Sequence, residues 1–319
     1  MSDVNAIKEL FLENNEFILL GLTGRTGSGC STAAKILSSE TPKFPSLESL
    51  GDFYSEMDGI RYNVLKQYTE AHWKAFNLIK VSDLISAYIL LLSKDMLAEF
   101  IYQYSGKTND SRVEKSKILS KLDKAIFKED RKSRLLKTLN KFIDHSKDFT
   151  LVADDFSKTS SLLNFLKGVT TTIKNELDSI QQGLYISTYQ AAGNSIRRLG
   201  KIEVNYEDKP FEPLSVFHLP ETLNKFIKGI KKENKGKAYV VIDALRNPYE
   251  VKFFKDRYSA FHLVSINAPD ENRRDYLNSY KFSGESIDEI DDRESGKVFN
   301  QTNIRKDKIS YFKIGRASC

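Results

Sequence analysis

The sequence is poor in cysteine and histidine. Of its 319 residues only two are cysteine, Cys30 and Cys319, and four are histidine. So few residues of these types build neither a disulfide framework nor a set of zinc ligands. We therefore expect a chain without zinc and without structural disulfides, located in a reducing cytoplasm.

Long apolar runs are also lacking. No stretch approaches the roughly 20 apolar residues that a bilayer span needs, and no basic region followed by an apolar one opens the chain. Apolar residues make up 40% of the chain and charged residues 29%, with a mean hydropathy of −0.43. These values are typical of globular domains, so we expect neither secretion nor membrane insertion.

The net charge of +6 is concentrated in one part of the chain. Residues 107–148 hold 13 basic and 7 acidic side chains, so this segment carries the whole excess. Mixed signs with few aromatic residues favour solvated helix faces. The alternative is a nucleic-acid-binding protein that uses these basic helices.

Apolar patterns predict an α/β domain with a parallel sheet flanked by helices. Apolar runs predict strands over 17–20, 238–242 and 260–266, and helical patterns cover 4–12, 31–37 and 250–256. From residue 61 the pattern is helical and takes in Leu78 and Ile79. We expect one domain over 1–300 with a helical insertion over 81–168, and a divergent or disordered tail over 301–319.

The strongest signal is a glycine-rich turn between the first strand and the next helix. Its residues are Gly24, Arg25, Thr26, Gly27, Ser28, Gly29, Cys30, Ser31 and Thr32. They match the P-loop pattern G-x-x-x-x-G-K-[ST], with Cys30 at the lysine position. Glycines let backbone N–H groups surround a phosphate, and the helix start adds its positive dipole end. We predict that this stretch binds nucleotide phosphates and that Ser31 ligates Mg²⁺; a purely structural turn is the alternative.

The missing lysine bears on catalysis. In phosphoryl transfer the loop lysine stabilises charge on the β- and γ-phosphates, and a neutral thiol does not replace it. Arg25, Lys35 or an arginine from elsewhere would have to supply the cation. We favour Arg25 because its position faces the mouth of the loop.

Asp243 ends an apolar strand and has the position of a Walker B aspartate, which holds Mg²⁺ directly or through water. Arg246 follows three residues later, where a guanidinium reaches a phosphate at the sheet edge. An ordinary turn after a strand is the alternative for both. We assign catalytic roles to Arg25, Asp243 and Arg246.

Two arginine pairs are further candidates. Arg197 and Arg198 follow a glycine and could grip a second nucleotide; the alternative is a solvated basic helix end. Arg273 and Arg274 follow the last predicted strand, where kinases of this architecture carry lid arginines, with a solvated surface as the alternative.

Several stretches together resemble a known family. They are Gly21 to Gly24, Gly27 to Ser31, His72 to Phe76, Ile242 to Pro248 and Phe254 to Phe261. These stretches resemble the amino-terminal P-loop domain of the anti-phage dCTP deaminases. That domain is nucleoside-monophosphate-kinase-like and precedes a zinc-dependent cytidine-deaminase-like domain. The resemblance implies a role in antiviral defence that concerns deoxycytidine nucleotides.

The resemblance covers most of the chain, to about residue 301, but the second, deaminase half of the family is missing. The zinc deaminase signature, with its ligands and its general acid/base glutamate, is not in the sequence. Residues 306–319 read as an unrelated tail, so a truncated product, a frameshifted product and a domain working alone all stay open. We do not expect this polypeptide to deaminate by itself.

Three functions follow as expectations. The first is a nucleotide-binding regulatory module that binds ATP or a deoxynucleotide (dCTP or dCMP) with Mg²⁺ and acts with a deaminase domain in trans or a regulatory RNA. The second is an active (deoxy)nucleoside monophosphate kinase with a non-standard P-loop, and the third is the nucleic-acid-binding protein. Cys30 favours the first over the second, and a homo-oligomer stays open.

Overall fold

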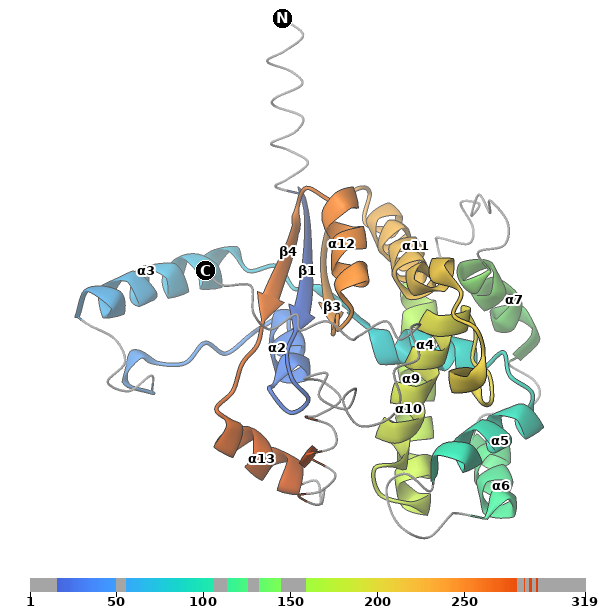
Figure 1. Ribbon diagram of the computed structural model, residues 1–319. Helices are drawn as coiled ribbons and strands as arrows, with labels where there is room; N and C mark the ends of the chain where they lie inside the picture. Colours follow the sequence, from blue (N-terminus) through green and yellow to red (C-terminus); the bar gives the residue numbers. More distant parts are fainter. Residues whose placement is uncertain are drawn as a thin grey trace, which may run out of the picture.

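The computed structural model describes residues 16–49, 56–105, 114–125, 132–144 and 159–279, with positions 284, 287, 288 and 291. The helix expected over 4–12 and the tail over 301–319 lie outside the described residues. In the described part, strands alternate with helices at both ends of the chain, and helices alone fill the middle (Figure 1).

Four parallel strands form one sheet in the order β2-β3-β1-β4. The strands are β1 (Phe17–Thr23), β2 (Asn77–Lys80), β3 (Ala238–Asp243) and β4 (Phe261–Ser265). In the register of the sheet, Asp243 is the partner of Leu22 on one side and of Lys80 on the other. The carboxyl ends of β1, β2 and β3 therefore meet at the same edge of the sheet.

Helices cover both faces of the sheet, which explains why its two central strands, β3 and β1, are largely apolar. On one face, α2 (Cys30–Leu37) buries Ala34 against Leu22 and Val241. On the other, Leu19 and Val240 join a larger core that continues into the helical part of the molecule. Successive residues of a strand face opposite sides, so β1 contributes to both cores.

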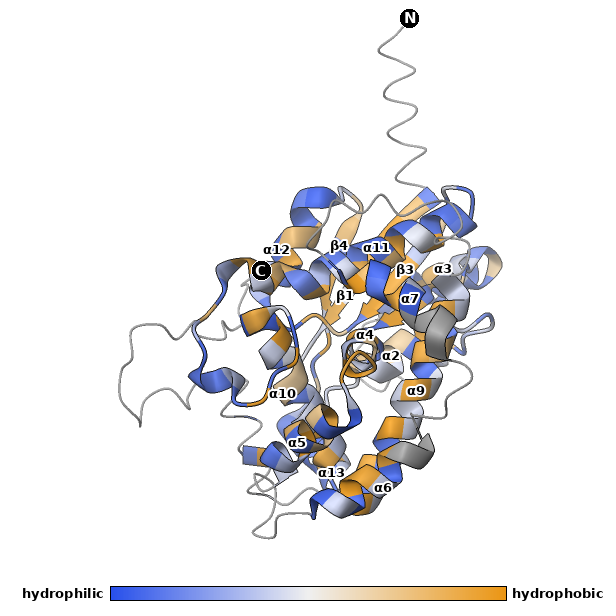
Figure 2. Cartoon of the chain, turned by 90° about the vertical axis from the view of Figure 1, so that its right-hand side faces the viewer, coloured by the Kyte–Doolittle hydropathy of each residue, from blue (hydrophilic) through white to orange (hydrophobic). Residues whose placement is uncertain are grey.

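A helical part lies between β2 and β3 and extends to residue 233, beyond the expected 81–168. Its helices pack apolar stripes against one another and keep polar residues outside (Figure 2). They are α4 (Val81–Ile89), α5 (Lys94–Ser105), α6 (Lys115–Ala125), α7 (Lys132–Ile143), α9 (Thr159–Ile180), α10 (Leu184–Leu199) and α11 (His218–Glu233). Two short 3₁₀ helices, Tyr206–Asp208 and Pro213–Phe217, join the last two.

The helical interpretation of Leu78 and Ile79 is wrong, because both lie in β2 and pair with Val241 and Ile242 of β3. A four-residue strand that runs directly into α4 continues the same apolar pattern, and periodicity alone does not separate the two.

Three further helices complete the described part. They are α3 (Glu56–His72), which projects from the side of the molecule, α12 (Pro248–Arg257) and α13 (Asp270–Ser279) (Figure 1). Within the described ranges, none of the helices combines the length and apolar character that a membrane crossing requires.

Candidate functional site

The chain leaves the neighbouring strands β1 and β3 in opposite directions along the sheet. The chain leaves β1 past β3 to reach β2, and leaves β3 past β1 to reach β4. Parallel sheets bind ligands where neighbouring connections diverge in this way, outside the carboxyl ends of the strands. The glycine loop, defined as Gly24 to Gly29, follows β1 here, and Asp243 ends β3 beside it.

Three glycines shape the loop for two different reasons. Gly27 and Gly29 have φ angles of 87° and 96°, in the left-handed region that other residues rarely adopt. Gly24 is needed for space, because a Cβ atom there would lie 2.3 Å from the carbonyl oxygen of Ile266. At Gly29 a Cβ atom would meet nothing closer than the Ile266 Cγ2 atom at 4.0 Å, so this part of the loop is open.

The amino terminus of α2 lies behind the open part of the loop. Gly29 is its N-cap and supplies no side-chain acceptor, and the first turn carries no acidic residue. The first backbone N–H groups and the positive end of the helix dipole are therefore not compensated by the helix itself. This arrangement suits an anion with several acceptor oxygens.

Cys30, at the lysine position, is the first residue of α2 and is only 9% exposed. Its Sγ atom lies 2.9 Å from the position of a Cβ atom on Gly24, so the thiol fills space under the loop. Ser31 and Thr32 come next and are exposed at the start of the helix. The Ser31 hydroxyl is thus accessible for a metal ion.

Asp243 is 8% exposed and lies beside two side chains that the sequence analysis missed. Lys80, its partner at the end of β2, is followed by Asp83 in the first turn of α4. Burial raises the pKa of the Asp83 carboxyl, while a hydrogen bond from Thr170 and the charge of Lys80 act in the opposite direction. The sequence did contain a signal, since Lys80 and Asp83 come just after the short apolar run Leu78 and Ile79. The interpretation of that run as helical concealed that it ends at the edge of the sheet.

Arg246 reaches the glycine loop from the segment after β3. Its Nη1 atom donates a hydrogen bond to the Thr26 hydroxyl at 2.9 Å, and the Leu245 amide donates to the Leu22 carbonyl at 2.8 Å. The fold therefore brings Arg246 to the glycine loop, and its predicted contact with a phosphate stays a prediction.

Arg25 is held by carboxylates beyond the loop. Its guanidinium pairs with Asp270 at 2.6 Å, and with Asp291 at 2.8 Å. The charge of Arg25 lowers the pKa of Asp270. Arg25 therefore faces two anions in this structure, whereas the sequence analysis expected it to face a phosphate.

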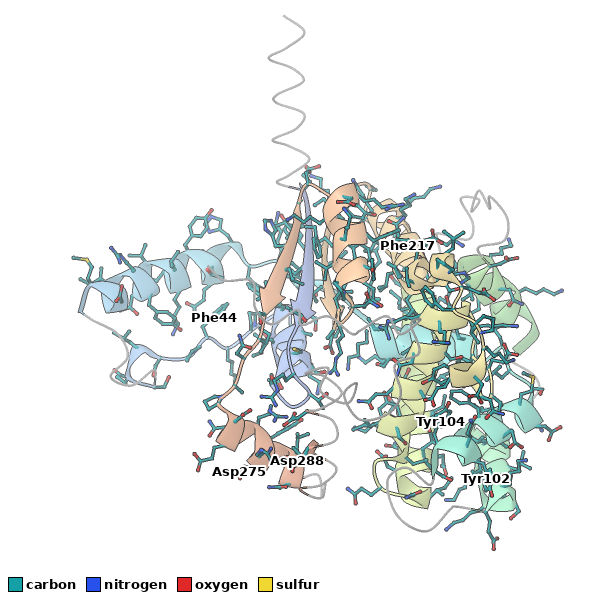
Figure 3. All side chains as sticks on the ribbon, in the orientation of Figure 1. Phe44, Tyr102, Tyr104, Phe217, Asp275 and Asp288 are labelled. Atoms are coloured by element: carbon teal, nitrogen blue, oxygen red, sulfur yellow. The ribbon has the colours of Figure 1, made fainter. Side chains whose placement is uncertain are left out.

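The two arginines of α13 differ in burial. Arg273 is fully buried, donates to the Thr26 carbonyl at 3.2 Å and pairs with Asp291, so it fastens α13 to the glycine loop. Arg274 is partly exposed and pairs with Asp288 at 2.6 Å beside α13 (Figure 3). Only the first of them contacts the loop.

Arg197 and Arg198 have partners elsewhere. Arg197 binds one carboxylate oxygen of Glu250, at the start of α12, through Nε and Nη2 at 2.8 Å each. Glu250 is fully buried, and its other oxygen has no hydrogen-bond partner. Arg198 donates to the Lys209 carbonyl at 2.9 Å and joins α10 to the following segment.

The described basic helices pack as ordinary amphipathic helices. α6 buries Ile118 and Leu122, while Lys121 pairs with Glu176 of α9 at 3.4 Å. The alternative of nucleic-acid binding stays a prediction, because much of the basic segment over 107–148 lies outside the described residues.

A metal site made of protein ligands alone does not occur in the described part of the chain, where no group of three or more His, Cys, Asp or Glu residues could hold an ion. Mg²⁺ that arrives with a nucleotide needs only one or two protein oxygens, since phosphates and water fill the remaining positions. The Ser31 hydroxyl and the Asp243 carboxylate are oxygen donors of the required type.

A shallow hollow of about 390 Å³ lies at the opposite edge of the sheet, between Lys74, Lys237 and Tyr239. It is lined by the amino ends of β2 and β3, the edge at which parallel sheets do not normally bind their ligands. We therefore place the candidate site at the glycine loop.

Comparisons with known proteins found no relative of this chain. The chain matches no protein-family model, no curated protein and no solved structure. The case for a function therefore depends on the geometry of the glycine loop and its neighbours.

Proposed function

We propose that the chain is a P-loop domain of nucleoside-monophosphate-kinase type that binds a nucleotide as its Mg²⁺ complex at the glycine loop. The observation that supports this most is the open loop in front of α2, with Gly27 and Gly29 in left-handed conformations and a buried Asp243 on the adjacent strand. Backbone donors, a helix dipole and a carboxylate are the groups that a metal-bound polyphosphate requires.

Each part of the loop has a distinct role in this proposal. The N–H groups that open α2 donate to the phosphate oxygens, and Ser31 and Asp243 hold the Mg²⁺ ion that neutralises part of their charge. Arg246, bound to the Thr26 hydroxyl at 2.9 Å, orders the loop and adds positive charge beside it.

Regulation by binding is favoured over turnover. The lysine position holds a buried thiol, and Arg25, the expected substitute, is paired with Asp270 and Asp291. Together with the resemblance to the anti-phage dCTP deaminases, this supports a cytoplasmic module that reports the level of ATP or a deoxycytidine nucleotide to a deaminase domain in trans.

Phosphoryl transfer is the second candidate, and the Lys80 and Asp83 pair beside Asp243 favours it. These side chains lie across Asp243 from the glycine loop, at the same edge of the sheet. A lysine can bind an acceptor phosphate there, and a carboxylate can accept a proton from an acceptor group.

Calorimetry tests nucleotide binding directly. The purified chain is titrated with ATP, dCTP and dCMP, each with Mg²⁺, and compared with Gly29→Asp and Gly236→Asp. Gly236 has a similar φ of 94° and equally open surroundings but lies before β3, away from the loop, so it reproduces the backbone strain alone. We expect Gly29→Asp to abolish binding and Gly236→Asp to retain it; no binding by the wild-type chain would refute the proposal.

Turnover separates the two candidates. Incubation of ATP and dCMP with the protein should leave both unchanged if the chain only binds. Formation of ADP and dCDP that is lost in Asp83→Asn would establish the kinase instead.

A further inference from the structure

Helix α3 contacts the rest of the molecule through its small and polar side. Gly59 is packed against Leu47, and the Tyr62 hydroxyl and Lys66 ammonium donate to the Pro45 carbonyl at 2.7 and 3.3 Å. Phe44 belongs to the same segment as Pro45 and Leu47 and lies below the helix (Figure 3). The side of α3 that faces its own chain is therefore not its apolar side.

The apolar side of α3 faces solvent. Five large apolar side chains on it are each about 60% exposed, namely Met57 59%, Ile60 60%, Val64 62%, Leu65 63% and Tyr68 64%. Spacings of three and four residues place them on one face of the helix. An amphipathic helix normally turns this face inward, so a mainly apolar face that is exposed on a projecting helix indicates an interaction surface (Figure 1).

The charges on α3 favour a protein partner over a membrane or a nucleic acid. Arg61 lies within the apolar face, four residues from both Met57 and Leu65, and its charge is paired with Asp58 at 3.2 Å. Membrane-surface helices and nucleic-acid-binding helices carry an excess of Lys and Arg, which this helix lacks. A neutral apolar face suits another helix of the same character.

We propose that two copies of this chain associate through α3, with the two helices antiparallel about a twofold axis. Such an arrangement places Met57 of each copy level with Tyr68 of the other, and Val64 of each copy level with Arg61 of the other near the axis. The same patch then covers itself, as an isologous interface requires. Five side chains with their flanks offer roughly 500 Å² per copy, or about 1,000 Å² for the pair, the lower end of specific interfaces.

Sedimentation velocity tests the proposal. Protein concentrations of about 1 to 200 μM bracket the micromolar dissociation constant expected for a small interface. We expect the wild-type chain to dimerise with a dissociation constant in the micromolar range. Met57→Glu and Tyr68→Lys should each weaken the dimer by about a hundredfold or more, because an unpaired charge is buried at both ends. Asn63→Glu, on an exposed position away from the apolar face, is the matched control and should leave it unchanged.

An equimolar mixture of the two variants identifies self-pairing. In the mixed dimer, the introduced glutamate of one copy meets the introduced lysine of the other at one end, and the native Met57 and Tyr68 meet at the other end. The mixture should therefore associate although each variant alone is monomeric. All exchanged residues are exposed in the single chain, so melting temperatures should not change at protein concentrations at which the wild-type chain is itself a monomer. A wild-type monomer throughout the range would overturn the proposal and leave the face to a different protein, and a dimer that survives both substitutions would place the interface elsewhere.

Discussion

Replacing Cys30 with lysine should increase the affinity for a nucleoside triphosphate. Cys30 begins α2 directly behind the open part of the glycine loop. In the proposed complex, a longer side chain at this position would extend along the phosphates. A hydrogen bond to a charged group contributes about 1.5–3 kcal/mol net, which corresponds to a roughly 10- to 150-fold lower dissociation constant. The gain should shrink as ionic strength rises, because it depends on charge.

The substitution also removes a buried side chain. The thiol fills space between Gly24 and the start of α2, and its loss costs about 1 kcal/mol of folding free energy. That cost lowers the melting temperature but does not enter the binding measurement, since both titrations start from the folded protein.

Calorimetry with ATP and Mg²⁺ on Cys30→Lys and Cys30→Met provides the test. Methionine has a long side chain without charge, so it reproduces the changed packing and omits the ammonium group. A lysine variant that binds no more tightly than the methionine variant would refute the assignment of this loop as a phosphate site.

Three further predictions concern carboxylates near the loop. Asp243→Asn should lower ATP affinity about tenfold in Mg²⁺ and leave it unchanged in EDTA, because only the metal complex uses this carboxylate; calorimetry showing an equal loss in both would contradict the role. Burial raises the pKa of Asp83 above its ordinary 3.8, so its contribution to stability is present below that value and is lost as pH rises through the raised pKa. At pH 7.5 the melting temperature of Asp83→Asn should therefore equal or exceed that of the wild-type chain, and any excess should disappear towards pH 4. A lower melting temperature of the variant at pH 7.5 would argue against the raised pKa of Asp83. Asp270→Asn should remove one of the two carboxylates that hold Arg25, leaving Asp291, and raise ATP affinity about two- to fivefold by calorimetry. The same gain in Glu271→Gln would show a general charge effect.

The sheet strands around the site were predictable because their burial on both faces leaves a continuous apolar run. This holds for β1 and β3, whereas β4 is a largely exposed edge strand whose apolar residues still form a run of strand length. The glycine loop followed from its position between the first strand and a helix. β2 was missed because its four residues continue without a break into α4. Only pairing with Val241 and Ile242, far along the chain, distinguishes that strand from a helical turn.

The partners of the site residues were not predictable from the sequence. Which side chains meet Asp243 depends on the order of the strands, and that order places Lys80 beside it. Arg25 is paired with Asp270 and Asp291 because α13 returns to the loop after β4. For Arg198, the local sequence suggested a contact with a ligand, but the fold directs its guanidinium to the Lys209 carbonyl.

The sheet register has a consequence for synthesis on the ribosome. Phe17 in β1 pairs with Ala238 in β3, about 220 residues later. At about 5–20 residues per second, β1 waits about 10 to 45 s for its first partner. During that interval the helices between β2 and β3 have already emerged and can pack locally. β1, which leads into the glycine loop, is thus synthesised before the other strands but gains its sheet partners only at the end of translation. Until then, its apolar side chains depend on chaperones or on neighbouring helices to shield them from water and from aggregation.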